Sequence, residues 1–258
     1  MFAQSESVFR FGRKTCYASQ AQKFVVLKLR AVTAADITHR SPVVEDYAKA
    51  IYSLGQEGAA TVATSALAER LEVTPGSVSA MVRKLDELGL AEHTPYRGVR
   101  LTADGRRVAL EVIRHHRLLE LFLSEILEVP WDRVHAEAEV LEHVLSSELE
   151  QIIAAKLGDP THDPHGDPIP SADFSIEELD TRSLDELNVG EAGLFARVSD
   201  SDPDMLRYLA ERSIRPGERF EVLDRQPFGG PLTVRFEGGA EHALGGELAR
   251  AMRVEVET

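Results

Sequence analysis

The stretch that decides the fold is VTPGSVSAMVRKLDELGL, residues 73–90. Thr74 is a favourable N-cap residue, and Pro75 suits the first position of a helix. Apolar side chains from Val78 to Leu85 recur at the spacing of one helical face, and Gly89 provides a C-terminal stop. The stretch therefore predicts a short capped helix with one buried face and an exposed face of small and basic residues.

The flanking segments predict that this helix belongs to a winged helix-turn-helix. Residues 44–54 carry apolar side chains at helical spacing, and residues 66–71 form a second, shorter helical pattern. After the central helix, LAEHTPYRGVRLT, residues 90–102, is typical of two short strands around a turn. Thr102 is the expected cap of a further helix that runs to about residue 127. Two helices, a recognition helix and a hairpin are the elements of this DNA-binding motif.

The exposed face of the central helix favours DNA binding over the alternative of a small helical domain without DNA. Small residues can approach base edges closely in the major groove, and basic residues suit phosphates. We expect base contacts from Thr74, Pro75, Gly76, Ser77 and Ala80. Phosphate contacts are expected from Arg83, Lys84, Arg97 and Arg100, with Tyr96 beside them at the hairpin tip.

Charge and composition allow this interpretation. The net charge of the 258 residues is −14, but residues 115–258 hold 31 acidic against 13 basic residues. The first 114 residues are therefore free of the acidic excess, and local charge matters for DNA binding. A single cysteine excludes an internal disulfide, and no apolar run is long enough to span a membrane, so a cytoplasmic protein is expected. Residues 1–40 lack a clear period and predict a disordered extension.

The second half of the chain predicts a different architecture. Residues 158–181 include GDPTHDPHGDPIPSAD and are typical of a proline-rich linker. Strand patterns with glycine and proline turns follow in residues 182–258, with one helix near residues 203–212, which indicates a small β-barrel. The expected fold class is α+β: a winged helix-turn-helix over residues 41–109, an all-α domain over 110–157 and a C-terminal barrel.

RVHAEAEVLEHVLSSELE, residues 133–150, predicts either a metal site or an ordinary solvated acidic helix. His and Glu side chains recur there on one face of a helix expected over residues 131–145, whereas Glu137 falls off that face. The preceding helix carries a second pair with one-turn spacing. Nitrogen and oxygen donors without thiolate suit Mn(II), Fe(II), Co(II) or Zn(II). The candidate ligands are His135, Glu139, Glu142 and His143 on one helix, and His116 and Glu120 on the other.

Several of these segments resemble one family. EDYAKAIYSL, the central helix, PYRGVRLTADG, RHHRLLELFL, VPWDRVHAEAEVLEHVLS and DPHGDPIP occur in order between residues 41 and 170. They are similar to the metal-dependent repressors typified by the diphtheria toxin repressor, the iron-dependent regulators and the manganese transport regulators. The resemblance implies a homodimeric, metal-activated repressor of operator DNA that is not an enzyme. It also implies that residues 110–157 bind metal and dimerise, and that residues 182–258 form an SH3-like (FeoA-like) domain.

The resemblance also implies a ligand set for this chain. The regulatory site maps onto Asp46, Glu139, Glu142 and His143, and an ancillary site maps onto His116, Glu120 and His135. Iron-responsive members carry methionine and cysteine where Asp46 and Glu139 stand, so the harder oxygen donors here favour Mn(II). Lys49 stands where one type of manganese regulator has a second carboxylate, which argues against a binuclear site. The barrel is expected to add Asp200 or Asp202 as a ligand.

In the expected mechanism, one metal ion is held by Asp46 on a helix of the DNA-binding domain and by Glu139, Glu142 and His143 on the dimerisation helix. The metal then fixes the angle between the two domains, so that the two recognition helices of a dimer fit successive major grooves. One rival is an Fe(II)-responsive repressor of iron uptake genes, and Zn(II) and Co(II) remain possible activators. A metallohydrolase and a purely structural metal staple are rivals of other classes. Three further histidines are not expected to bind metal: His115 is predicted at the surface, and His162 and His165 are predicted as solvated linker residues.

Overall fold

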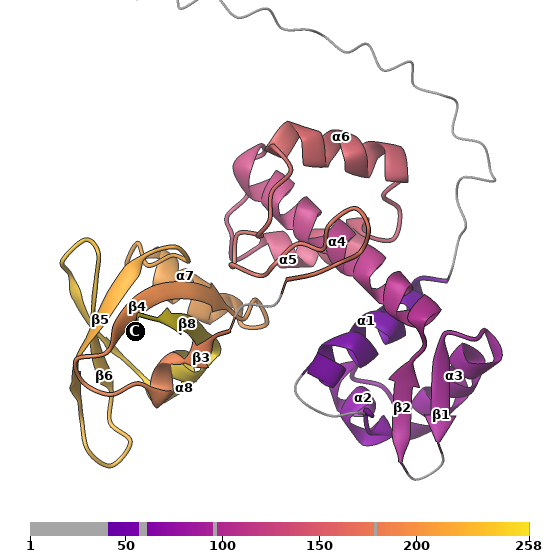
Figure 1. Cartoon of the computed structure of the whole chain (residues 1–258), viewed down its shortest axis with the longest axis horizontal. Coiled ribbons are helices and arrows are strands. Elements are labelled where there is room, and N and C mark those ends of the chain that lie inside the picture. Colours follow the sequence, from indigo (N-terminus) through magenta and orange to yellow (C-terminus); the bar gives the residue numbers. More distant parts are fainter. Residues whose placement is uncertain (1–40, 57–60, 95–96, 178–179, 258) are drawn as a thin grey trace, which may run out of the picture.

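The computed structural model describes residues 41–56, 61–94, 97–177 and 180–257. The predicted extension over residues 1–40 and Tyr96 lie outside these described residues. The described chain is a mixed α+β fold in three parts: a helical part with a two-stranded sheet, a second helical part, and a six-stranded sheet (Figure 1). The predicted fold class is thereby confirmed. Among the described helices, none combines the length and apolar content needed to cross a bilayer.

The first part is a winged helix-turn-helix built around α3 (Pro75–Glu87). Its cap is the predicted one, because Thr74 Oγ1 accepts a hydrogen bond of 3.2 Å from the backbone N–H of Ser77. Val78, Val82 and Leu85 are buried in a core shared with the neighbouring helices. The other elements of this part are α1 (Pro42–Gln56), α2 (Thr64–Arg70), β1 (Ala91–Thr94) and β2 (Gly98–Leu101).

The wing is held against the segment before α2 by a close backbone approach. Val62 and Val99 form an antiparallel bridge with hydrogen bonds of 2.8 and 2.9 Å. Gly98, which precedes Val99, has a φ of +105°, and a Cβ atom there would lie 2.4 Å from the Val62 carbonyl oxygen. Only glycine fits this position without moving the hairpin. This contact therefore holds the wing close to the segment before α2.

The second part consists of α4 (Ala103–Glu125), α5 (Val134–Leu141) and α6 (Ser147–Leu157). Thr102 caps α4 as predicted and accepts a hydrogen bond of 3.1 Å from the Gly105 N–H. In Figure 1, α4 extends from the winged domain into the second helical part. Its length allows one face to contact α1 and another to contact α5 and α6. One continuous helix thus connects the winged part to the helices that follow it.

The predicted helix over residues 131–145 is wrong at both ends. α5 begins only at Val134 and ends at Leu141, so Glu142 and His143 lie in the turn that follows it. The cause at the N-terminal end is Trp131, which is 3% exposed and packs into the core of the C-terminal part. A residue committed to that core leaves the helical path. Trp131 thereby anchors the C-terminal part to the second helical part.

The C-terminal part is one antiparallel sheet with strand order β3-β8-β4-β5-β6-β7. Its strands are β3 (Arg182–Ser183), β4 (Ala192–Val198), β5 (Arg219–Arg225), β6 (Leu232–Phe236), β7 (Glu241–Leu244) and β8 (Met252–Val256). The accompanying helices are η1 (Leu184–Glu186), α7 (Pro203–Ala210) and α8 (Gly246–Ala251). The strand patterns of the sequence, GLFARVSD, RFEVLDR, LTVRFE and MRVEVE, correspond to β4, β5, β6 and β8, and the helix predicted near residues 203–212 corresponds to α7. The sequence pattern misses β3, β7 and α8, which are short and lack strong apolar periodicity.

The segment predicted as a linker packs closely on the rest of the chain. Phe174 and Ile176 contact the apolar cluster formed by α1 and α4, and Arg114 on α4 donates a hydrogen bond to the Pro170 carbonyl oxygen. Gly166 approaches β4 so closely that a Cβ atom would lie 2.0 Å from the Ala196 carbonyl oxygen. The segment therefore connects the three parts through direct contacts and not only through chain connectivity.

Candidate metal centre and DNA-binding face

The first group of candidate ligands joins α1 to the turn after α5. Asp46 Oδ1 lies 2.9 Å from His143 Nε2, and Glu142 Oε1 lies 3.6 Å from the same nitrogen. Single ligand atoms of these three residues fit within 4.8 Å of one another. We call them the first group. Glu142 is fully buried, whereas the Asp46 side chain is 37% exposed. A cation at this position would contact both the winged domain and the second helical part.

Glu45 supports this group and was missed in the sequence. Its Oε2 atom lies 2.7 Å from Nδ1 of His143, on the other side of the imidazole ring. A carboxylate on the second ring nitrogen fixes the tautomer and the orientation of a histidine, which leaves Nε2 free to act as a ligand. The only available signal was its position beside Asp46, which does not reveal that it contacts a distant histidine.

The structure places Glu139 apart from the first group. Its Oε1 atom lies 3.8 Å from His116 Nδ1, and the ligand atoms of His116, Glu139 and Glu142 fit within 4.8 Å. We call these three residues the middle group. Lys49 Nζ contacts all three. The four residues expected to form one regulatory site are therefore divided between two adjoining groups that share Glu142.

A further group contains all three expected ancillary ligands. Glu120 Oε1 lies 3.0 Å from His116 Nε2 and 3.3 Å from His135 Nδ1. Asp200, which follows β4, completes this ancillary group because its Oδ2 atom lies 2.9 Å from His135 Nδ1. Asp202 has a different role: its side chain caps α7 by accepting from the N–H groups of Asp204 and Met205. Of the two aspartates left open by the sequence, Asp200 is the one at the ligand group.

A buried group on the far side of Glu120 was not predicted. His165 Nδ1 lies 3.7 Å from Glu120 Oε2, and both side chains have no exposed surface. Among the described residues, these two atoms are buried side-chain polar atoms with no hydrogen-bond partner. Asp163 completes the buried group, with a ligand atom within 4.8 Å of theirs. Orphaned polar atoms of this kind are rare in folded proteins and point to a bound ion or water.

Two of the three histidines predicted at the surface are buried. His165 Nε2 donates a hydrogen bond to the Trp131 carbonyl oxygen, 3.0 Å away, and the imidazole stacks on the Trp131 ring. His115 is 8% exposed and lies 3.2 Å from Glu150 Oε2. These predictions were wrong because linker composition and helical position do not show which segments pack against them. His162 is exposed, as expected.

The electrostatics indicate that His116, His135 and His165 hold protons when no metal competes for them. The hydrogen bond with Asp200 is the main cause that raises the pKa of His135 to about 10. Burial lowers the pKa of His116, but hydrogen bonds with Glu120 and Glu142 outweigh it and raise the value to about 9. Burial also lowers the pKa of His165, but the Glu120 carboxylate 3.7 Å away outweighs burial and raises the value to about 9. The protein thus neutralises its carboxylates with protons that a divalent cation can replace.

The donor atoms fit a divalent metal of the first transition row. All are carboxylate oxygens or imidazole nitrogens, which suit Mn(II), Fe(II), Co(II) and Zn(II), and none is sulfur. The burial of Glu120 and Glu142 argues against a solvated acidic helix, because clustered buried carboxylates need a positive charge nearby. The orphaned atoms of the buried group provide independent support. The donor atoms and their burial are therefore compatible with a bound divalent cation.

The residues predicted to contact DNA are exposed on the winged domain wherever the structure describes them. The described members are Thr74, Pro75, Gly76, Ser77, Ala80, Arg83, Lys84, Arg97 and Arg100, and each is exposed. Arg100 also pairs with Glu92 across the hairpin at 2.6 Å, but both side chains are more than half exposed, so water weakens the pair. This set has small residues at the N-terminus of α3 and basic residues beside it.

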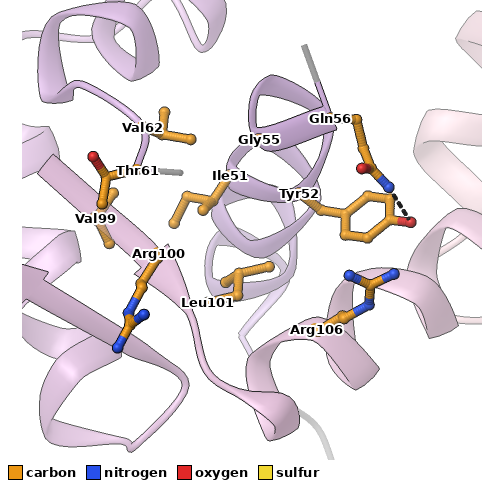
Figure 2. Close-up of a pocket in the computed structure, with 10 residues that line it drawn as sticks. All are labelled: Ile51, Tyr52, Gly55, Gln56, Thr61, Val62, Val99, Arg100, Leu101 and Arg106. Atoms are coloured by element: carbon orange, nitrogen blue, oxygen red, sulfur yellow. Dashed lines mark hydrogen bonds between the residues drawn. The ribbon is translucent and has the colours of Figure 1, made fainter. Parts of the chain in front are cut away.

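A separate cavity of about 160 Å³ lies behind the wing. Figure 2 shows that Ile51 and Tyr52 of α1 line it together with Val99, Leu101 and Arg106. It contains none of the candidate metal ligands. The cavity is therefore distinct from the ligand groups.

Three family descriptions match successive parts of the chain. Residues 39–99 match "Iron dependent repressor, N-terminal DNA binding domain". Residues 102–171 match "Iron dependent repressor, metal binding and dimerisation domain", and residues 182–256 match "FeoA domain". Together they account for the described chain in the order in which the three parts occur.

Individual proteins are similar over most of their length. The iron-dependent repressor IdeR of Mycobacterium tuberculosis is 32% identical over 223 residues, covering 82% of this chain and 96% of its own. The diphtheria toxin repressor of Corynebacterium diphtheriae is 32% identical over 225 residues, with the same coverage. A solved manganese-dependent transcriptional repressor in complex with manganese is 45% identical, with a TM-score of 0.76, covering 82% of this chain and 98% of its own.

Proposed function

The chain belongs to the family of iron-dependent repressors, which are metal-dependent DNA-binding transcriptional repressors and not enzymes, and we propose that it is activated by Mn(II) and controls genes of manganese homeostasis. The observation that carries the proposal is the contact between Asp46 and His143, in a ligand group made only of oxygen and nitrogen donors. Mn(II) is held by such hard donors and competes poorly for thiolates. A repressor of this kind acts in the cytoplasm.

The residues of the first group would transmit metal binding to DNA. Asp46 lies on α1, whose buried side chains pack against α2 and α3. Glu142 and His143 belong to the second helical part. When bound, the metal supplies two positive charges that all three residues can share. Asp46 then stays close to the turn after α5, which restricts the orientation of α3 relative to that turn and raises the population of the DNA-binding arrangement.

A homodimer would convert this restriction into operator recognition. Apolar side chains of α5 and α6 are exposed, with Val140 at 71% and Leu149 at 48% exposed, and Val144 in the turn between them at 70% exposed. Such a patch is typical of a protein interface. In a two-fold dimer, two α3 helices would enter successive major grooves of DNA. By linkage, operator DNA would tighten metal binding by the factor by which metal tightens DNA binding.

The proposed division of labour follows the predicted boundaries. Residues 41–109 bind DNA, residues 110–157 bind metal and dimerise, residues 158–181 connect, and residues 182–258 supply Asp200. The small residues at the start of α3 would contact bases and thymine methyl groups, and the basic residues would contact phosphates. The proposed metal ligands are Asp46, Glu139, Glu142 and His143 for activation, and His116, Glu120, His135 and Asp200 for the ancillary group, with Asp163 and His165 beside Glu120.

Manganese is favoured over iron by the donor types and by the higher identity, 45% against 32%, to a manganese-dependent repressor than to the iron-dependent relatives. The alternative is an Fe(II)-responsive repressor of iron uptake genes. The deciding experiment first selects a duplex from a random library with the Mn(II)-loaded protein. Binding to that duplex is then titrated with Mn(II), anaerobic Fe(II), Zn(II) and Co(II), each at buffered free concentration. If Fe(II) activates DNA binding at a lower free concentration, relative to its cellular supply, than the other metals do, the iron-responsive alternative is favoured. DNA binding that does not depend on any metal would contradict both the manganese and the iron hypotheses.

A further inference from the structure

Lys49 lies at the centre of a group of metal-type ligands. It extends from α1, and its Nζ atom lies 2.7 Å from Glu139 Oε1. The same atom lies 2.9 and 3.0 Å from the two carboxylate oxygens of Glu142 and 3.3 Å from His116 Nδ1. These three residues are the whole of the middle group. The ammonium group therefore occupies the position at which a cation would contact all three ligands.

The contacts of Lys49 are those of a bound cation and not of a surface ion pair. Its side chain is only 20% exposed, and that of Glu142 is not exposed at all. A buried carboxylate without a positive partner is strongly unfavourable. Glu142 receives that partner from within the chain, on both of its oxygens. The first group and the ancillary group are different, since among the described residues the structure places no lysine or arginine within ion-pair distance of Asp46, Glu120 or Asp200.

We propose that Lys49 is a tethered cation that takes the place of a metal ion in the middle group, so that no divalent metal occupies the position between His116, Glu139 and Glu142 while Lys49 is present. The inference rests on the proposed function, because it concerns which of the adjoining ligand groups take metal. The tether holds the ammonium at its ligands at high effective concentration. Replacement of Lys49 by a metal would also place two divalent ions on either side of Glu142.

This role makes Lys49 a determinant of metal number. Lys49 leaves the first group, the ancillary group and the buried group available to metal, and it closes the middle group to metal. It also joins α1 to α5 by charge in the absence of metal, since Nζ contacts Glu139 on α5 and Glu142 in the turn after it. The metal-free protein is therefore expected to keep part of the interdomain contact that metal binding completes.

The test is the number of Mn(II) ions bound per chain, measured by equilibrium dialysis with elemental analysis on the full-length protein. Lys49→Glu removes the cation and adds a carboxylate, and should bind one more Mn(II) than the wild type. Lys49→Arg keeps the charge and should bind the wild-type number. Lys156→Glu makes the same charge change at an exposed position of α6 and should also bind the wild-type number. We call Lys49→Glu and Lys49→Met opening variants, because both remove the cation from the middle group. Lys49→Met is used if Lys49→Glu does not fold.

Two outcomes would overturn the inference. One is an equal number of Mn(II) ions in the wild type and in the folded opening variant. The other is an anomalous-scattering peak for manganese between Glu139 and Glu142 in crystals of the wild type. A wild-type chain that binds no Mn(II) at all overturns the proposed function instead. Electron paramagnetic resonance adds an independent measure, because two neighbouring Mn(II) ions in the opening variant should show a spin coupling that the wild type lacks.

Discussion

Asp46 Oδ1 lies 2.9 Å from His143 Nε2 and so joins the winged domain to the turn after α5. Glu45 fixes the orientation of this imidazole, because its Oε2 atom lies 2.7 Å from the other ring nitrogen, Nδ1 of His143. Two neighbouring carboxylates of α1 thus contact one histidine of another domain. Under the proposed function, a metal bound at this contact would restrict the relative orientation of the two domains.

Metal preference should follow the donor types of Asp46 and Glu139. The double substitution Asp46→Met and Glu139→Cys introduces two soft sulfur donors, which should shift activation of DNA binding from Mn(II) towards Fe(II). The measurement is a titration of DNA binding against each buffered metal under anaerobic conditions. Glu137→Cys is the control, because Glu137 is exposed on α5 outside the ligand groups. An unchanged order of metals in the double variant would refute the donor-type argument.

Metal binding should release protons near neutral pH. The pKa values of His135 and His116, about 10 and about 9, lie above the ordinary value of about 6.5, so both side chains are protonated in the metal-free fold at pH 7. Ligand histidines must be neutral, so Mn(II) affinity should rise as the pH increases from about 6.5 towards these values. Calorimetry at pH 7 in buffers of different ionisation enthalpy measures the release. A binding enthalpy that does not depend on the buffer would contradict it.

The same raised values have a consequence for the metal-free protein. A histidine whose pKa is higher in the folded than in the unfolded state stabilises the fold below the unfolded pKa of about 6.5 and loses that contribution as the pH rises through the folded value. The pKa of His165, about 9, adds to the effect. The metal-free fold should therefore become less stable between pH about 6.5 and 10, and saturating Mn(II) should reduce this loss.

Asp200 should contribute to metal binding from the C-terminal part. Asp200→Asn weakens the acceptor 2.9 Å from His135 Nδ1, so the affinity of the ancillary group should fall by about 10–100-fold. Asp202→Asn is a close control, because asparagine caps a helix about as well as aspartate and the α7 cap remains. Equal Mn(II) affinities of the two variants in competition with a chelating dye would exclude Asp200 as a ligand.

Trp131 should determine the attachment of the C-terminal part. The residue is 3% exposed and packs in the core of that part. Trp131→Ala should lower the free energy of unfolding by about 3–5 kcal/mol, the typical cost of removing a buried aromatic side chain. Urea unfolding followed by circular dichroism measures the change. Phe228→Ala removes a fully exposed aromatic residue, and a comparable loss in that control would show that burial is not the cause.

The local elements could be predicted from the sequence because their signals are local. Thr74 and Thr102 are caps in the structure as expected, and the spacing of His116 and Glu120 places them one turn apart on α4. Helical periodicity identifies which side chains share a face. It does not show what packs against that face, and so it could not separate Glu139 from the first group.

The remaining features depend on contacts between distant segments. The burial of His165 follows from the packing of a proline-rich segment on β4 and Trp131, and composition alone predicts a solvated linker there. The choice between Asp200 and Asp202 depends on where α7 begins. In the sequence, Lys49 stood out only because it occupies the position at which one type of manganese regulator has a second carboxylate. Its contacts with α4 and α5 become apparent only in the three-dimensional arrangement.

The most direct test of the central claim is the Mn(II) dependence of DNA binding by Asp46→Asn, measured on the selected duplex by fluorescence anisotropy. Asparagine preserves the size of the side chain but removes the charge that joins α1 to His143. The account predicts that the variant folds, and that its activation by Mn(II) is weakened by more than the ~10–100-fold expected for loss of a supporting residue, while Glu137→Gln behaves as the wild type. Activation of Asp46→Asn at the wild-type Mn(II) concentration would contradict the account.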